Sequence, residues 1–159
     1  MRRILEVIGL AALALLLEET LRALYGADPL RGLIPTHFNI AGQPDAWGSP
    51  HMLWLIPGIA CVLYLLMTWV SRHPGAFNFP VRVTPFNRGR LEVLALSMIA
   101  WLKVELVCFF ALLQWSIIRA ARNPGRGFDA LPMPAFLGVI FLTIGIHFVA
   151  ILRAGRSQA

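Results

Sequence analysis

The side chains that could do chemistry gather in residues 34–49, a polar stretch between two apolar segments. His37 supplies an imidazole nitrogen and Asp45 a carboxylate, a pair that suits zinc or another transition metal, and the oxygen of Asn39 is an unusual third donor. The same groups would suit a small polar ligand, because a stiff loop can present them together. The residues expected to bind a ligand are Thr36, His37, Asn39, Asp45 and Trp47.

The same residue types also have a structural use. Side chains such as those of Thr36, Asn39 and Asp45 commonly bond to nearby backbone amides and cap helix ends. In that arrangement His37 would bridge two carbonyl groups, and Trp47 would hold the loop at the membrane interface. The sequence leaves both uses open.

Two prolines and two glycines give the stretch its expected stiffness. Pro35 and Pro44 fix φ and lack an amide donor, while Gly42 and Gly48 permit backbone angles closed to other residues. We therefore expect residues 34–49 to form a loop that keeps a defined shape without a helix or a strand ladder.

The stretch also carries a distinctive string of residues. In order, it contains Pro35-Thr36-His37-Phe38-Asn39 and then Gly42, Pro44, Asp45, Trp47, Gly48 and Ser49. This string resembles the hallmark of a bacterial membrane domain of unknown function, number 1648, which also forms the N-terminal part of immunity proteins against secreted killing-factor toxins. The resemblance implies a bacterial inner-membrane protein without implying a particular activity.

A second string, residues 73–81, looks like the segment that these proteins carry after their next membrane helix. In the family a basic residue often follows the Trp-Gly-Ser triplet, whereas this chain has Pro50 and His51 there. Neither residue carries a fixed positive charge, so a contact that needs such a charge at this point could not form. His51 instead adds a second histidine to the loop, which favours a metal slightly.

Three ionisable residues lie inside apolar segments, where charges are costly and usually face a partner or a water-filled cavity. Lys103 and Glu105 are two positions apart, so they point to different sides of a helix and need separate partners. We expect pairs with the first helix, Glu19 with Lys103 or Arg22 with Glu105. His147 in a later segment would be a hydrogen-bonded interhelical residue, or would join Glu105 in an ion or proton relay.

Composition places these sites in a membrane protein. Hydrophobic residues make up 58% of the 159 residues, charged residues 14%, and the mean hydropathy is +0.70. We expect an all-α fold, a four-helix transmembrane bundle with structured loops, forming a single membrane domain over residues 1–159. Cys61 and Cys108 fall inside apolar segments, so neither a disulfide nor a metal site is expected from them. The expected helices are residues 4–24, 52–70, 91–118 and 135–152.

The basic residues predict the orientation of the bundle. The formal net charge is +6, but the arginines stand at the ends of apolar runs rather than on one polar face, which argues against nucleic-acid binding. With both termini in the cytoplasm, eight arginines of the termini and of the second loop lie inside, against four outside. The basic connection over residues 119–132 opposes this arrangement. The balance predicts a multi-pass inner-membrane protein whose loop 34–49 is extracytoplasmic.

The leading functional hypothesis is a small, non-enzymatic membrane protein whose extracytoplasmic loop binds a peptide, a lipid or an ion. One alternative is a metal-dependent membrane enzyme that uses His37 and Asp45 as ligands. Another is a transport component in which Glu105 and His147 line a polar path. No hydrolase, metalloprotease or nucleotide-binding motif is present in the sequence. The sequence indicates neither a cofactor nor an oligomeric state.

Overall fold

The structure is a computed structural model that describes residues 1–39, 41–123 and 132–156. Two short 3-10 helices, η1 (Pro50–Trp54) and η2 (Pro74–Ala76), accompany the main elements. The main elements are α1 (Arg2–Tyr25), β1 (Ile34–Phe38), β2 (Pro44–Gly48), α2 (Leu55–Ser71), α3 (Arg88–Arg122) and α4 (Pro132–Arg156). The four expected helices are therefore confirmed, and a two-stranded sheet is added to them.

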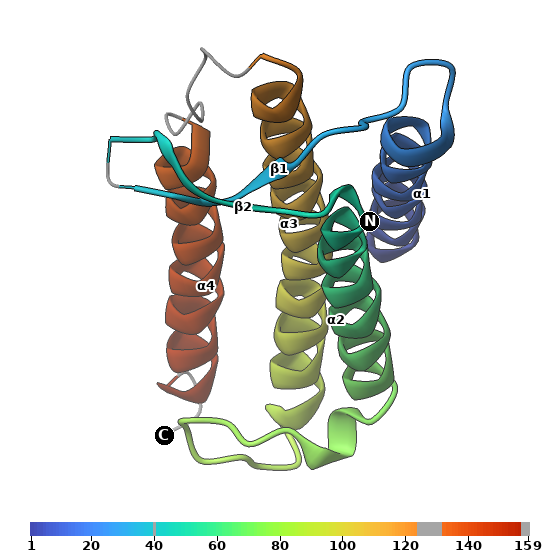
Figure 1. Ribbon diagram of the computed structural model, residues 1–159. Coiled ribbons are helices and arrows are strands. Elements are labelled where there is room, and N and C mark those ends of the chain that lie inside the picture. The colour runs from blue at the N-terminus through green and yellow to red at the C-terminus, as the bar shows by residue number, and fades with distance from the viewer. Residues whose placement is uncertain (40, 124–131, 157–159) are drawn as a thin grey trace.

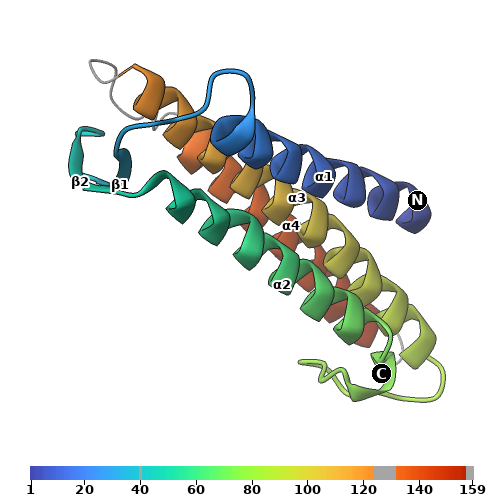
Figure 2. The same ribbon diagram turned by 45° about the vertical axis from the view of Figure 1, so that its right-hand side comes forward.

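Helix α3 is the centre of the molecule and contacts α1, α2, α4 and β1. Figure 1 shows it between α4 on one side and α1 and α2 on the other. The sheet lies at one end of the bundle, whereas the connection between α2 and α3 and the end of α4 lie at the opposite end (Figure 2). The described helices therefore run alternately up and down the bundle (Figure 2).

Within the described residues, three helical segments are long and apolar enough to cross a membrane: Pro50–Ser71, Arg88–Arg122 and Met133–Arg156. The first helix is formed as expected, but it carries Glu6 near its start and two adjacent acidic residues near its end. The finding of three candidate spans supports a membrane protein. A fourth crossing by α1 stays a prediction.

Local signals set the helix ends. Gly26 ends α1, and its amide donates to the carbonyl oxygen of Arg22. The hydroxyl of Ser49 accepts a hydrogen bond from the amide of His51 at the start of η1. Before α3, the side chains of Thr84 and Asn87 each accept from the other's backbone amide. Such caps satisfy backbone groups that a helix leaves unpaired at its ends.

The stretch predicted to be a loop without a strand ladder is instead a β-hairpin, so that expectation is wrong. Strands β1 and β2 pair antiparallel, with Ile34 opposite Gly48 and Phe38 opposite Pro44, and the pairing is irregular on either side of His37. Gly42 has a φ of 73°, which gives the connection its tight turn. The prolines fit because strands this short leave backbone positions that need no amide donor.

Buried apolar side chains connect the hairpin to the helices. Ile34 packs with Ala23, Leu24, Leu53 and Ile118, which come from α1, η1 and α3. A buried carbonyl or amide in this region would need a partner, and the strand pairing supplies it. The hairpin is therefore fixed on the end of the bundle by its own first residue.

Gly155 predicts a measurable packing effect at the opposite end. A Cβ atom added there would come within 2.5 Å of the Cβ of Val81, in the connection between α2 and α3. We expect Gly155→Ala to lower the free energy of unfolding by about 2 kcal/mol, since a β-branched neighbour cannot give way. The control is Gly145→Ala in the same helix, where nothing lies within 4 Å. Unfolding in a denaturing detergent would measure both, and equal stabilities would contradict the contact.

Candidate ligand site at the hairpin

The hairpin brings His37 and Asp45 together. Nδ1 of His37 lies 2.5 Å from Oδ1 of Asp45, across the two strands. The two side chains keep 68% and 43% of their surface exposed, so the pair stays open to a ligand. Because a carboxylate only accepts hydrogen bonds, a proton on Nδ1 is donated to Asp45, and Nε2 of His37 is left as a further polar atom.

Asn39 has the structural role rather than the ligand role. Its Oδ1 accepts hydrogen bonds from the amides of Ala41 and Gln43, each at 3.0 Å. The backbone of Asn39 also accepts from the amide of Gly42 and donates to the carbonyl oxygen of Gln43, both at 2.9 Å. This side chain therefore shapes the turn, and its oxygen is already used.

The other expected ligand residues lie beside the pair without joining it. Thr36 is an exposed residue at the irregular point of β1, and its methyl group lies close to Gly48. Trp47 lies opposite Pro35 in the hairpin, with 45% of its surface exposed. An exposed indole in this position is typical of a residue at a membrane interface.

The described part of the chain contains no group of three or more His, Cys, Asp or Glu side chains that could hold a metal ion. His51 is directed elsewhere, with its ring 6.5 Å from that of Tyr25. Catalytic zinc sites use three protein ligands, whereas His37 and Asp45 supply two. The metal-dependent enzyme stays a prediction, and the described contacts add no third ligand to His37 and Asp45.

A groove runs beneath the hairpin, from His37 toward the middle of the bundle. Its volume is 430 Å³, and its walls come from β1, the start of α2 and one face of α3. Leu55 and Ile59 on its edge are 61% and 41% exposed, so the groove continues into the outer surface of the helices. The lining residues are Ile34, Pro35, Thr36, His37, Phe38, Met52, Leu53, Leu55, Ile56, Ile59, Phe110, Leu113 and Ile117.

This groove could not be predicted from the sequence, because its residues come from three separate segments. Each segment is apolar for reasons of membrane insertion alone, so no pattern in it indicates a cavity. One signal in the sequence is that His37 follows closely after Ile34 and Pro35, the two buried residues with which β1 begins.

Lys103 has a different partner from the one expected. Its Nζ lies 2.6 and 2.7 Å from the two carboxylate oxygens of Glu6, and 2.9 Å from Oγ1 of Thr68. Lys103 is 2% exposed, and its ammonium also lies 4.4 Å from the ring centroid of Tyr64. The expected pair of Glu19 with Lys103 is therefore wrong. Glu6 was missed, although an acidic residue in an apolar run was a signal.

Glu105 and Arg22 do not pair either. The Oε1 of Glu105 accepts from the hydroxyl of Thr143 at 2.6 Å, whereas Arg22 pairs with Glu18 one turn earlier in its own helix. The expectation failed because Glu105 faces α4 rather than α1. Lys103 and Glu105 do point to different sides of α3, as their spacing predicted.

His147 is an interhelical residue. Its Nδ1 donates to the carbonyl oxygen of Thr143 at 2.8 Å, and its Nε2 lies 3.3 Å from the hydroxyl of Ser97 in α3. Thr143 thus contacts both Glu105 and His147. The relay hypothesis stays a prediction, now with its contacts defined.

Cys61 and Cys108 are free cysteines. Ile40 and part of the basic connection around Arg126 lie outside the described residues. The effect of that connection on the orientation therefore stays a prediction.

A comparison with family models gives one match, over residues 33–61, to a family described as Domain of unknown function (DUF1648). Searches of curated proteins and of solved structures give no match. The matched segment covers β1, β2, η1 and the first turns of α2. It thus contains the His37–Asp45 pair and the start of the groove, as the string of residues from Pro35 to Ser49 predicted. Residues 33–61 of this chain are thus similar to the domain of unknown function that this family model describes.

Proposed function

We propose that the protein is a small, non-enzymatic membrane protein that binds a lipid-like amphiphile at the hairpin. The acyl chain of the ligand lies in the groove beneath β1, and its polar head contacts His37 and Asp45. The observation that carries this proposal is the direct continuity between an exposed polar pair and an apolar groove. The immunity-like role implied by the sequence resemblance stays a prediction.

The chemistry of the walls selects this type of ligand. An apolar groove favours hydrocarbon, at about 0.8 kcal/mol for each methylene removed from water. Asp45 repels an anionic head. A hydroxyl group can instead donate a hydrogen bond to the carboxylate of Asp45, and it can accept one from His37 when the ring nitrogen that faces the ligand carries a proton. The groove is also open on the side of Leu55 and Ile59, from which a chain in the bilayer can enter. We therefore expect an uncharged head with hydroxyl groups.

The binding test uses a fluorescent monoacylglycerol and the purified protein in detergent. We expect His37→Ala and Asp45→Ala each to weaken binding about tenfold, equal to roughly 1.4 kcal/mol, because each removes one side of the polar pair. The double variant should be little weaker than either single variant, since both act on one contact.

His73→Ala is the matched control, because His73 lies at the opposite end of the bundle and bonds to the carbonyl oxygen of Trp69. Its binding should equal that of the unmodified protein. Independent, additive losses for His37 and Asp45, or an equal loss for His73, would overturn the shared site. Thermal unfolding of all variants distinguishes loss of binding from loss of fold.

We also propose that the hairpin faces the extracytoplasmic side, with both termini in the cytoplasm. The support is the excess of arginines at the opposite end of the bundle. In whole cells, a membrane-impermeant thiol reagent should label Ala46→Cys and leave Gly75→Cys unlabelled, in a background without Cys61 and Cys108. Labelling of Gly75→Cys alone would reverse the orientation.

A further inference from the structure

We propose a second binding site, a cleft between α1 and the C-terminal part of α3 that holds the zwitterionic headgroup of a phospholipid. In this site Arg119 binds the phosphate and Glu19 binds the ammonium group. It shares no lining residue with the groove beneath the hairpin.

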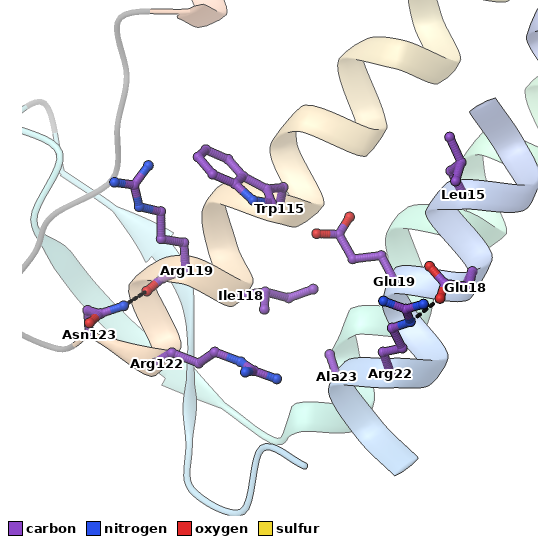
Figure 3. Close-up of a pocket in the computed structure, with 10 residues that line it drawn as sticks. All are labelled: Leu15, Glu18, Glu19, Arg22, Ala23, Trp115, Ile118, Arg119, Arg122 and Asn123. Carbon is purple, nitrogen blue, oxygen red and sulfur yellow. Dashed lines mark hydrogen bonds and ion pairs between the residues drawn. The ribbon is translucent and has the colours of Figure 1, made fainter. Parts of the chain in front are cut away.

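The cleft has a volume of 610 Å³ and opens on the surface of the bundle near the hairpin end. Figure 3 shows Glu19 extending from α1 toward the ring of Trp115, with Arg119 beyond that ring on α3. Leu15 and Trp115 are 65% and 41% exposed, so the apolar part of the cleft continues into the outer face of the helices. The lining residues are Leu15, Glu18, Glu19, Arg22, Ala23, Trp115, Ile118, Arg119, Arg122 and Asn123.

Two of the charged groups in the cleft already have partners. Arg22 forms an ion pair with Glu18 in the same helix. Arg122 lies 3.4 Å from a carboxylate oxygen of Asp28 and donates to its carbonyl oxygen at 3.1 Å. These pairs leave that part of the cleft nearly neutral.

Arg119 and Glu19 form no ion pair with any residue of the described ranges. The guanidinium of Arg119 stacks on Trp115, with Cζ 4.8 Å from the ring centroid, which leaves its N–H edge available. Guanidinium binds phosphate through paired hydrogen bonds, and a carboxylate binds ammonium. Opposite walls of one cleft thus carry one unused charge of each sign.

This arrangement selects a zwitterion over a simple anion. A phosphate without an ammonium group would gain Arg119 but would be repelled by Glu19. A headgroup that carries both charges satisfies both walls, while its acyl chains lie along Leu15 and Ile118 in the bilayer. Tryptophan at the mouth fits the level of the headgroups.

The experiment measures binding of phosphatidylethanolamine and phosphatidylglycerol to the detergent-purified full chain by native mass spectrometry. We expect phosphatidylethanolamine to bind about fivefold more tightly. Glu19→Gln should abolish this preference by strengthening the binding of phosphatidylglycerol, and Arg119→Gln should weaken both lipids about tenfold. Glu92→Gln at the opposite end, whose carboxylate pairs with Arg88 at 2.9 Å, is the control and should change neither.

Equal or tighter binding of phosphatidylglycerol to the unmodified protein would overturn the proposal, as would an unchanged preference in Glu19→Gln. Soluble phosphoethanolamine, which has no acyl chains, should bind much more weakly than the lipid, and equal binding would overturn the assignment to a lipid. His37→Ala should keep the lipid preference, so failure here and failure at the hairpin are distinguishable.

Discussion

Lys103→Ala is expected to lower the free energy of unfolding by about 3 kcal/mol, because it removes one partner of an ion pair inside the bundle. The ammonium group contacts both oxygens of Glu6 and the hydroxyl of Thr68, and only 2% of the residue is exposed. The substitution leaves the Glu6 carboxylate with the hydroxyl of Tyr64, which donates to it at 2.8 Å. This loss is at the lower end of the range for breaking a buried ion pair, because 35% of the Glu6 side chain is exposed.

The matched control is the double variant Lys103→Met with Glu6→Gln. Methionine keeps the length of the lysine stem, and glutamine carries no charge, so the unpaired carboxylate is absent. We expect this double variant to lose clearly less free energy of unfolding than the sum of the losses in the single variants Lys103→Met and Glu6→Gln. Unfolding followed by tryptophan fluorescence measures all of them, and simple additivity would contradict the coupling of α1 to α3 through this pair.

Gln114→Glu should have the second large effect, a loss of about 3 kcal/mol. Gln114 is completely buried, and its Nε2 donates to Oγ1 of Thr20 at 2.8 Å and to the carbonyl oxygen of Leu53 at 3.3 Å. The hydroxyl of Thr20 already donates to Leu16, so it can only accept from residue 114. A glutamate carboxylate would place oxygen against oxygen at both contacts, in a fully buried site.

Gln114→Leu separates the charge from the packing. Leucine keeps most of the volume and also removes Oε1 of Gln114, which has no partner among the described residues. We expect a smaller loss of about 1 kcal/mol, because the Leu53 carbonyl loses a donor but no charge is buried and the Thr20 hydroxyl keeps its bond to Leu16. Thermal unfolding of the two variants gives the comparison. Equal losses would show that packing alone decides the stability at this level of the bundle.

Much of the fold follows from the sequence. The apolar runs predicted all four helices, because a bilayer demands long uninterrupted helices of this composition. The hairpin was not predicted, since Pro35 and Pro44 argue against a ladder and the strands are too short to show alternation. Pairing depends here on the packing of Ile34 against α1 and α3, which is a tertiary contact.

The partners of charged residues were harder to predict than the helices. Lys103 was assigned to Glu19, yet it pairs with Glu6, more than three turns away along α1. A shift of α1 along α3 changes which carboxylate is in reach, and no residue pattern fixes that shift. The prediction that Lys103 and Glu105 face different sides held because it needed only the geometry of one helix.

In the candidate site, too, the local features could be predicted and those that depend on tertiary packing could not. His37 and Asp45 were chosen from residue type within one short stretch, and the turn at Gly42 brings them together. Asn39 was chosen on the same grounds but bonds to the turn itself. The groove depends on the packing of β1 over α2 and α3, so only the structure reveals it.

Binding of an acyl chain in the groove can be measured by photo-crosslinking with a monoacylglycerol that carries a photoreactive group in its chain, followed by mapping of the labelled peptides. We expect the labels to concentrate on Met52, Ile56 and Phe110, which line the groove, and His37→Ala to reduce them. Exposed residues of α4, such as Phe141 at 69%, provide the background level of contact with detergent or lipid. Labels spread evenly over α4 and the groove, and unchanged in His37→Ala, would show that the groove is not a binding site for the acyl chain.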